Sequence, residues 1–218
     1  MFNPMVWRLI WQATGETLYM VGVAVVLAEA VGLPLGIILV TTERGHILEN
    51  PLVNRVLATI INIGRSIPFI ILMVAIIPFT RMLVGTSIGT TAAMVPLTVA
   101  AIPFVARLVE TALKEVDGGV VEAALALGAS PFEIIWKVLI PEALPSLVSG
   151  VTITAVNLIG YSAMAGAVGG GGLGDLAVRY GYQRFRTDIM LATVIILIVL
   201  VQAMQSLGDW ASKSLSKK

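Results

Sequence analysis

The sequence predicts an all-α membrane protein with about five transmembrane helices. Of its 218 residues, 57% are hydrophobic and only 12% are charged. The mean hydropathy of +0.95 lies well outside the balance of a soluble domain. Apolar residues also gather into runs of roughly 20, the length that a helix needs to cross about 30 Å of hydrocarbon. A helix satisfies its own backbone groups in lipid, so each run predicts a helix.

Five apolar segments reach or approach this length. They are expected at 18–40, 56–77, 86–105, 147–168 and 189–207. The third contains Pro96 and Pro103, and the fifth ends in Gln202 and Gln205, so these two helices are expected to tilt or to end in water. The residues before the first segment lack the basic, apolar and small-residue order of a cleaved signal, so this span is expected to remain as an anchor.

Lysine and arginine residues predict the orientation of the chain, because they favour the cytoplasmic side when short loops are compared. With the long segment between the third and fourth spans placed inside, the cytoplasmic side holds eight of them: Arg44, Arg55, Arg107, Lys114, Lys137, Lys213, Lys217 and Lys218. The other side holds five: Arg8, Arg81, Arg179, Arg184 and Arg186. This bias predicts an N-terminus outside the membrane and a C-terminus in the cytoplasm.

Composition and motifs argue against several other classes of protein. A net charge of +1 gives no positive electrostatic field that would attract nucleic acid. The absence of cysteine excludes thiol nucleophiles and thiolate metal sites. No P-loop is present, and the GxGxxG spacing of Gly169, Gly171 and Gly174 follows a span rather than a strand. His46, the one histidine, has no metal-ligand neighbours, so we expect a solvated side chain and no metal site. A membrane hydrolase would need a facing nucleophile and base, which no span offers.

The segment 107–143 mixes apolar and charged residues and is expected to lie outside the hydrocarbon. Gly118 and Gly119 interrupt its helical pattern. The run VVEAALAL that follows favours a helix, and Gly128 suits the C-terminus of that helix. The sequence therefore predicts a short helix over 120–127 that ends in a turn at Gly128.

A second short helix is predicted directly after this turn. Ser130 as the N-cap, Pro131 at the first helical position and Glu133 at the third make a capping box. We expect this helix to run from Pro131 toward Pro141.

Small residues give the predicted turn a smooth surface. Ala123, Ala124, Gly128 and Ala129 carry little or no side chain, so the backbone of another protein can approach closely. We interpret the segment as a docking element. The alternative is an amphipathic helix pair that rests on lipid, which the first helix disfavours because it has few basic residues and no aromatic anchor.

The run EAALALGASPFEIIWKVLIP, which begins at Glu122, resembles the EAA signature of binding-protein-dependent ABC importer permeases. In that family this cytoplasmic loop is the coupling helix, which sits in a cleft of a separate ATPase subunit and carries the motion of nucleotide binding to the membrane helices. The resemblance implies that ATP and Mg belong to the partner subunit and that this chain binds no cofactor itself. It also implies that the docking residues are Glu122, Ala123, Ala124, Gly128, Ala129 and Ser130.

Motifs along nearly the whole chain are similar to the methionine-uptake branch of that family. They are RSIPFIIL, IPFTR, VGTSIG, IPEALPSLV and GYSAMAGAVGGGGLGDLA. The resemblance implies a homodimer that works with two ATPase subunits, a lipid-anchored binding protein and membrane lipid, and imports D- or L-methionine. Another amino acid, an osmoprotectant or a phosphonate is the alternative cargo. The expected division is an N-terminal segment (1–16), a permease domain (17–208) with its coupling loop at 109–145, and a cytoplasmic tail (209–218).

The fourth span is the preferred candidate to line a translocation pathway. It combines Asn157, Tyr161, Ser162 and Met164 with small residues, a composition that suits close packing around a pathway. Spacings of four and three place Asn157, Tyr161 and Met164 on one helical face, and Met164 would suit an apolar gate. The alternative is that this face packs against the third span.

Two ionisable residues fall within the expected spans, where charge is costly and usually functional. Arg65, followed by Ser66, is expected at the dimer interface or the inner end of the pathway, where a structural role is favoured, in which it binds backbone carbonyls or snorkels inward. Glu29 either pairs with it or faces a wet cavity. Glycine pairs at four-residue spacing, Gly32 with Gly36 and Gly166 with Gly170, predict close helix contacts.

The glycine-rich run after the fourth span is expected to form a turn that a partner approaches closely. Asp175 and the arginines from Arg179 to Arg186 would then form an outer rim that meets a binding protein. An ordinary polar loop is the alternative.

Overall fold

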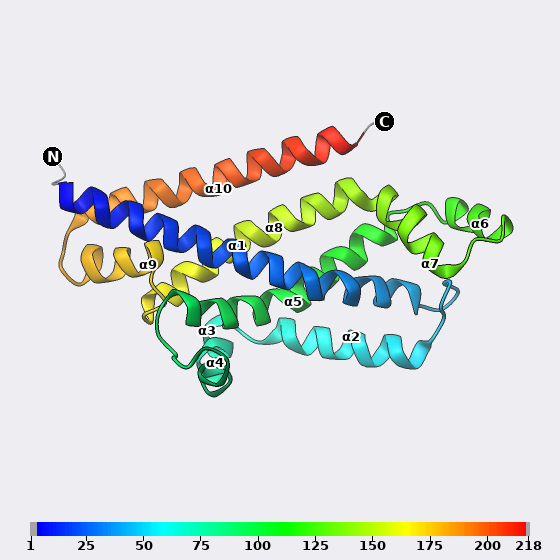
Figure 1. Cartoon of the computed structure of the whole chain (residues 1–218), viewed down its shortest axis with the longest axis horizontal. Coiled ribbons are helices and arrows are strands. Elements are labelled where there is room, and N and C mark those ends of the chain that lie inside the picture. The colour runs from blue at the N-terminus through cyan, green and yellow to red at the C-terminus, as the bar shows by residue number, and fades with distance from the viewer. Residues whose placement is uncertain (1–3, 217–218) are drawn as a thin grey trace.

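The computed structural model describes residues 4–216, and helices make up almost all of that part of the chain (Figure 1). The α-helices are α1 (Pro4–Thr41), α2 (Pro51–Ser66), α3 (Phe69–Ala75), α4 (Ile77–Val84), α5 (Thr90–Lys114), α6 (Gly118–Ala126), α7 (Pro131–Ile134), α8 (Ile140–Ala167), α9 (Gly172–Leu176) and α10 (Thr187–Leu215). Two π-helical stretches, Ile135–Leu139 and Ala177–Tyr182, lead into α8 and follow α9. The long helices run lengthwise, with α6 and α7 at one end and α9 near the other.

The expected five spans correspond to four continuous helices and one broken helix within residues 4–216. α1, α5, the helix Pro131–Ala167 and α10 are each long and apolar enough to cross a membrane. The second span differs from the straight helix expected at 56–77, because α2 and α3 are bent by 99° relative to each other. Pro68 lacks a backbone donor and disfavours helical geometry in the residue before it. Ile67 is accordingly extended, with φ −85° and ψ 121°.

The first and last spans are longer than expected. α1 has 38 residues, which corresponds to about 57 Å at 1.5 Å per residue, well beyond the hydrocarbon thickness of about 30 Å. α10 likewise continues to Leu215. The expected N-terminal segment and C-terminal tail are therefore helical extensions of these two spans where they are described, while Lys217 and Lys218 lie outside the described residues.

Close contact between α1 and α5 forms the centre of the protein, and the expected role of Gly32 and Gly36 is confirmed. A Cβ on Gly32 would lie 2.5 Å from Val105, and a Cβ on Gly36 would lie 2.5 Å from Val109. Only glycine allows the two backbones to approach this closely. α8 packs against α5 and α1, and α10 packs against α8.

The glycine-rich loop after α8 folds back onto its own chain. Glu16 of α1 accepts a hydrogen bond from the Gly172 N–H at 2.8 Å, and the Thr17 hydroxyl accepts one from the Leu173 N–H at 2.9 Å. A Cβ on Gly174 would lie 2.3 Å from the carbonyl oxygen of Ala163, and one on Gly166 would lie 2.4 Å from a backbone nitrogen of α9. The close approach expected from a partner is therefore made by α1 and α8 of the same chain.

Replacement of Gly174 by alanine is predicted to destabilise this end of the protein. The added methyl group would collide with backbone rather than with a movable side chain, and such overpacking costs about 1–3 kcal/mol. Gly160→Ala in α8 is the control, because nothing lies within 4 Å of its added Cβ. Thermal unfolding in detergent should show a lower midpoint for Gly174→Ala alone, and equal midpoints for the two variants would contradict the packing described.

Candidate functional site

The predicted docking helix is present as α6, and its two ends are capped. Asp117 accepts a hydrogen bond from the Gly119 N–H at 2.7 Å, so the helix begins at Gly118 rather than at the expected position 120. At the other end Gly128 has φ +82°. The N–H of Ala129 donates to the carbonyl oxygen of Ala124 at 3.1 Å, and that of Gly128 to Leu125 at 2.9 Å. This is the Schellman arrangement that a glycine C-cap favours.

The capping box predicted after the turn is confirmed. The hydroxyl of Ser130 accepts a hydrogen bond from the Glu133 N–H at 3.3 Å, and the Glu133 carboxylate accepts one from the Ser130 N–H at 3.1 Å. Two tight caps in succession therefore fix the direction in which the chain leaves the docking helix.

The second helix does not end near Pro141, as the sequence suggested. The backbone widens into a π-helical stretch, in which the N–H of Ile140 donates to the carbonyl oxygen of Ile135, and α8 follows without a break. Proline cannot supply a helical N–H and clashes with the preceding turn, and the wider turn accommodates both effects. The helix from the docking turn is thus continuous with a transmembrane span (Figure 1).

The docking segment presents one part of its surface outward and packs the other against the body. Ala123, Gly128 and Ser130 are exposed, and Leu127 at the apex is 89% exposed. Ala124 and Ala129, expected on the docking surface, are instead partly buried against the main core. Leu127 was not among the predicted docking residues, although its place beside a C-cap glycine was a signal for exposure.

A hollow of about 330 Å³ separates α6 from the α1–α2 connection and the end of α5. Glu122, expected on the docking surface, lines this hollow together with Glu43, His46 and Lys114. His46 is half-buried rather than fully solvated, and this burial lowers its pKa below the ordinary value. Glu122 therefore faces the space between the docking helix and the body.

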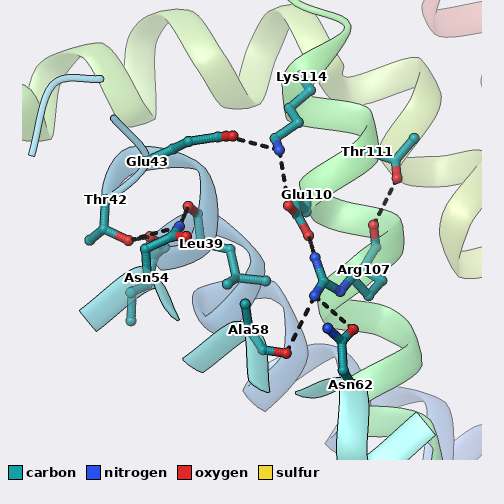
Figure 2. Close-up of polar contacts among 11 residues, drawn as sticks. Leu39, Thr42, Glu43, Asn54, Ala58, Asn62, Arg107, Glu110, Thr111 and Lys114 are labelled. Carbon is teal, nitrogen blue, oxygen red and sulfur yellow. Dashed lines mark hydrogen bonds and ion pairs between the residues drawn. The ribbon is translucent and has the colours of Figure 1, made fainter. Parts of the chain in front are cut away.

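A polar network joins α2, α5 and the end of α1 behind the docking segment (Figure 2). Lys114 forms ion pairs with Glu43 at 2.8 Å and with Glu110 at 3.0 Å. Glu110 also pairs with Arg107, whose guanidinium donates to the side-chain oxygen of Asn62 at 2.8 Å. Hydrogen bonds to charged groups are among the stronger ones in proteins. The network therefore ties the broken second span to the helix that leads into the docking segment.

A second polar contact strengthens the same end of the protein. The side-chain amide of Asn54 donates to the carbonyl oxygen of Leu39 at 2.6 Å, which joins α2 to α1 (Figure 2). The spacing of Arg107, Glu110 and Lys114 along α5 was visible in the sequence. Their partners elsewhere in the chain were not, because Asn62 is 45 residues from Arg107 and Glu43 is 71 residues from Lys114.

The four pathway candidates on α8 do not share one face. Asn157 and Tyr161 are half-buried, and Met164 is 48% exposed on the same side of the helix. Ser162 is buried elsewhere and donates to the carbonyl oxygen of Ile159 at 2.7 Å. The Tyr161 ring stacks on Phe69 of α3, with centroids 4.6 Å apart. This stacking brings α8 against the bend in the second span.

The intramembrane ionisable residues are not paired with each other. No ion pair joins Glu29 to Arg65 within residues 4–216, and Arg65 is exposed in the last turn of α2. Ser66 donates to the carbonyl oxygen of Asn62 at 2.8 Å. At the outer end Asp175 pairs with Arg179. In the described chain no group of three His, Cys, Asp or Glu residues could hold a metal ion.

The chain is similar to known transport proteins over most of its length. It is 61% identical over 201 residues to a probable D-methionine transport system permease protein, MetI, of Vibrio cholerae serotype O1, with coverage of 92% of this chain and 89% of the relative. It is 46% identical over 209 residues to the methionine import system permease protein MetP of Bacillus subtilis, with coverage of 96% and 94%.

Solved structures agree with these relatives. An inward-facing structure of the MetNI methionine ABC transporter contains a chain with 48% identity and a TM-score of 0.97, and all of both chains is covered. Residues 32–217 also match the family described as the binding-protein-dependent transport system inner membrane component. The chain therefore belongs to this family of inner-membrane transport components.

Proposed function

We propose that this chain forms the translocation pathway of an ABC importer for methionine and is driven by separate ATPase subunits that dock on Asp117–Ser130. The single observation that carries the driving mechanism is the continuity of the docking turn with the span Pro131–Ala167. The cargo is supported by the names of the relatives from two distant bacteria. Another amino acid, an osmoprotectant or a phosphonate would leave the mechanism unchanged.

The docking segment is suited to pass a push to several spans at once. It is joined to α5 through Glu115–Asp117 and to α8 through the capped turn. The Ser146 hydroxyl donates to Glu115 at 2.6 Å, which holds α8 beside the end of α5. Displacement of α6 by a partner would therefore move α5 and α8, and the network at Arg107 would carry α2 with them.

The remaining parts of the proposed assembly follow from the same arrangement. Two copies of this chain would enclose the pathway, and two ATPase subunits would bind ATP and Mg at the cytoplasmic end, where α6 lies. A binding protein would deliver cargo at the opposite end, near α9, with the N-terminus outside and the C-terminus in the cytoplasm. The solved relative supports this assembly because it is an inward-facing ABC transporter for methionine.

Uptake by the reconstituted assembly tests the cargo. Vesicles that hold this chain with its ATPase subunits, supplied with its binding protein and ATP, should accumulate labelled methionine and not labelled glycine betaine or a phosphonate. A complex that hydrolyses ATP and accumulates one of the other compounds instead would contradict the assignment of methionine.

Leu127→Asp is predicted to weaken capture of the ATPase. Because the side chain is 89% exposed, the change should leave the fold intact, while burial of an unpaired carboxylate in the partner's cleft would cost about 3–5 kcal/mol. Copurification of the tagged permease with its ATPase measures the effect. Phe185→Asp is the matched control, because Phe185 is 85% exposed in the loop between α9 and α10. Retention of the ATPase by Leu127→Asp at the control level would count against docking at this turn.

Asn62→Ala is predicted to uncouple ATP hydrolysis from uptake without loss of the ATPase. The change removes the side-chain acceptor for Arg107, a contact that joins α2 to α5 and is worth about 1 kcal/mol in a partly exposed setting. Thr59→Ala is the control, because the Thr59 hydroxyl donates only to the carbonyl oxygen of Arg55 in its own helix. The ratio of methionine imported to ATP hydrolysed should fall severalfold for Asn62→Ala alone, and an equal ratio in both variants would remove this contact from the coupling route.

A further inference from the structure

One face of α2 carries polar side chains along its whole length. Arg55, Thr59, Asn62, Arg65 and Ser66 follow one another at helical spacings of four, three and three or four, and all are exposed in the described chain. Such a polar face on a helix within a membrane is energetically costly unless it contacts water or other polar groups. This stripe, which we call the α2 polar face, therefore requires water or other polar groups beside it.

Arg65 lies near the inner edge of the membrane, at the end of this face. A Cβ on its neighbour Gly64 would lie 3.1 Å from Pro103, and Pro103 is close to the midpoint of α5, which spans Thr90–Lys114. The 99° bend follows immediately after Arg65 and Ser66. Arg65 is thus carried beside the part of α5 that leads from the membrane into its charged end, where the second span changes direction.

Two separate hollows lie along α2. One, of about 320 Å³, is lined by Arg65 together with Phe104 and Thr111 of α5. The other, of about 410 Å³, is lined by Arg55 and Thr59 on the same α2 polar face. Each is within the range of roughly 300–1,000 Å³ that is common for small-molecule sites. The hydrogen bond from Arg107 to Asn62 joins the lining of one hollow to that of the other.

Arg65 is the cation in the first hollow that has no ionic partner. The other two, Arg107 and Lys114, are both paired with Glu110. No hydrogen bond or ion pair reaches the Arg65 side chain from within residues 4–216. A guanidinium group presents a planar set of donors that matches a carboxylate. The hollow therefore offers one unmatched positive charge at its inner end.

We propose that Arg65 binds the α-carboxylate of the amino acid cargo while the pathway is open to the cytoplasm. This inference rests on the proposed function, because it requires that the cargo be an amino acid. Arg65 would then discriminate for the carboxylate, while the apolar ring of Phe104 lies beside the cargo side chain in the same hollow. A single solvent-exposed ion pair is weak, which suits a site from which the cargo must leave.

A cysteine reporter in the same hollow tests this site without the binding protein. The chain has no native cysteine, and Thr111 is exposed and lines the hollow with Arg65. Thr111→Cys, in the nucleotide-free complex with cysteine-free ATPase subunits, is treated with a thiol reagent. Methionine should slow the modification, whereas methioninamide, which keeps the side chain and lacks the carboxylate, should not.

Two variants of α2 separate Arg65 from the general charge of the helix. Arg65→Gln should weaken protection by methionine about threefold to fivefold, the effect expected for loss of a solvent-exposed ion pair, and Arg65→Lys should keep part of it. Arg55→Gln is the matched control, because Arg55 lies on the same face nearer the cytoplasm, and it should protect as the parent does. Copurification of the ATPase shows that each variant has folded.

Three results would overturn the proposal. They are equal protection by methioninamide, undiminished protection in Arg65→Gln, and no protection in a parent complex that imports methionine. If the parent complex imports no amino acid at all, the proposed function fails instead, so the two failures are distinguishable.

Discussion

The uninterrupted helix from Pro131 to Ala167 is the constraint on which the rest of the arrangement depends. A docking turn that ended in a flexible linker would move without moving the membrane, since a loop transmits little force. Here the Schellman turn at Gly128 and the capping box at Ser130 lead into a helix that crosses the membrane. The π-helical stretch before Pro141 preserves this continuity where proline would otherwise end the helix.

Close packing determines which helices move together with the span Pro131–Ala167. Gly32 and Gly36 let α1 and α5 approach until an added methyl group would collide. The network around Arg107 then joins α2 to this pair at the cytoplasmic end, and Glu16 and Thr17 hold the loop after α8 at the outer end. Contacts at both ends therefore hold α1, α5 and α8 together as one unit. Relative to this unit, the bent second span is the element most able to change direction.

Local signals predicted much of this protein, and long-range contacts account for most of what was missed. The capping box, the glycine C-cap and four of the spans depend on residues close together in sequence, so they could be predicted. Pro68 itself was visible in the sequence. The bend was not predicted, because the apolar segment 56–77 continues on both sides of this proline. Pro141 predicted a helix end, because proline lacks a backbone donor. The π-helical turn before it allows the helix to continue instead.

In the candidate site, too, local sequence signals could be predicted and long-range contacts could not. The position of the docking turn followed from its motif, but the exposure of Leu127 and the inward position of Ala124 depend on how α6 packs. On the α2 polar face, Arg65 and Ser66 were predicted as intramembrane polar residues, whereas Thr59 and Asn62 were not, because they lie within the apolar segment 56–77. Partners such as Asn62 and Arg107 are 45 residues apart, and no local pattern joins them.

The central claim is that the docking turn and the span α8 move as one body. Spin labels placed singly at Phe132, beside the turn, and at Val168, directly after α8, would report the distance between the two copies at each end. Both sites are exposed, and the chain has no native cysteine to interfere. Binding of ATP to the complete transporter is predicted to change both distances. A change at Phe132 with none at Val168 would show that the push is absorbed before it reaches the far side of the membrane, and would contradict the account.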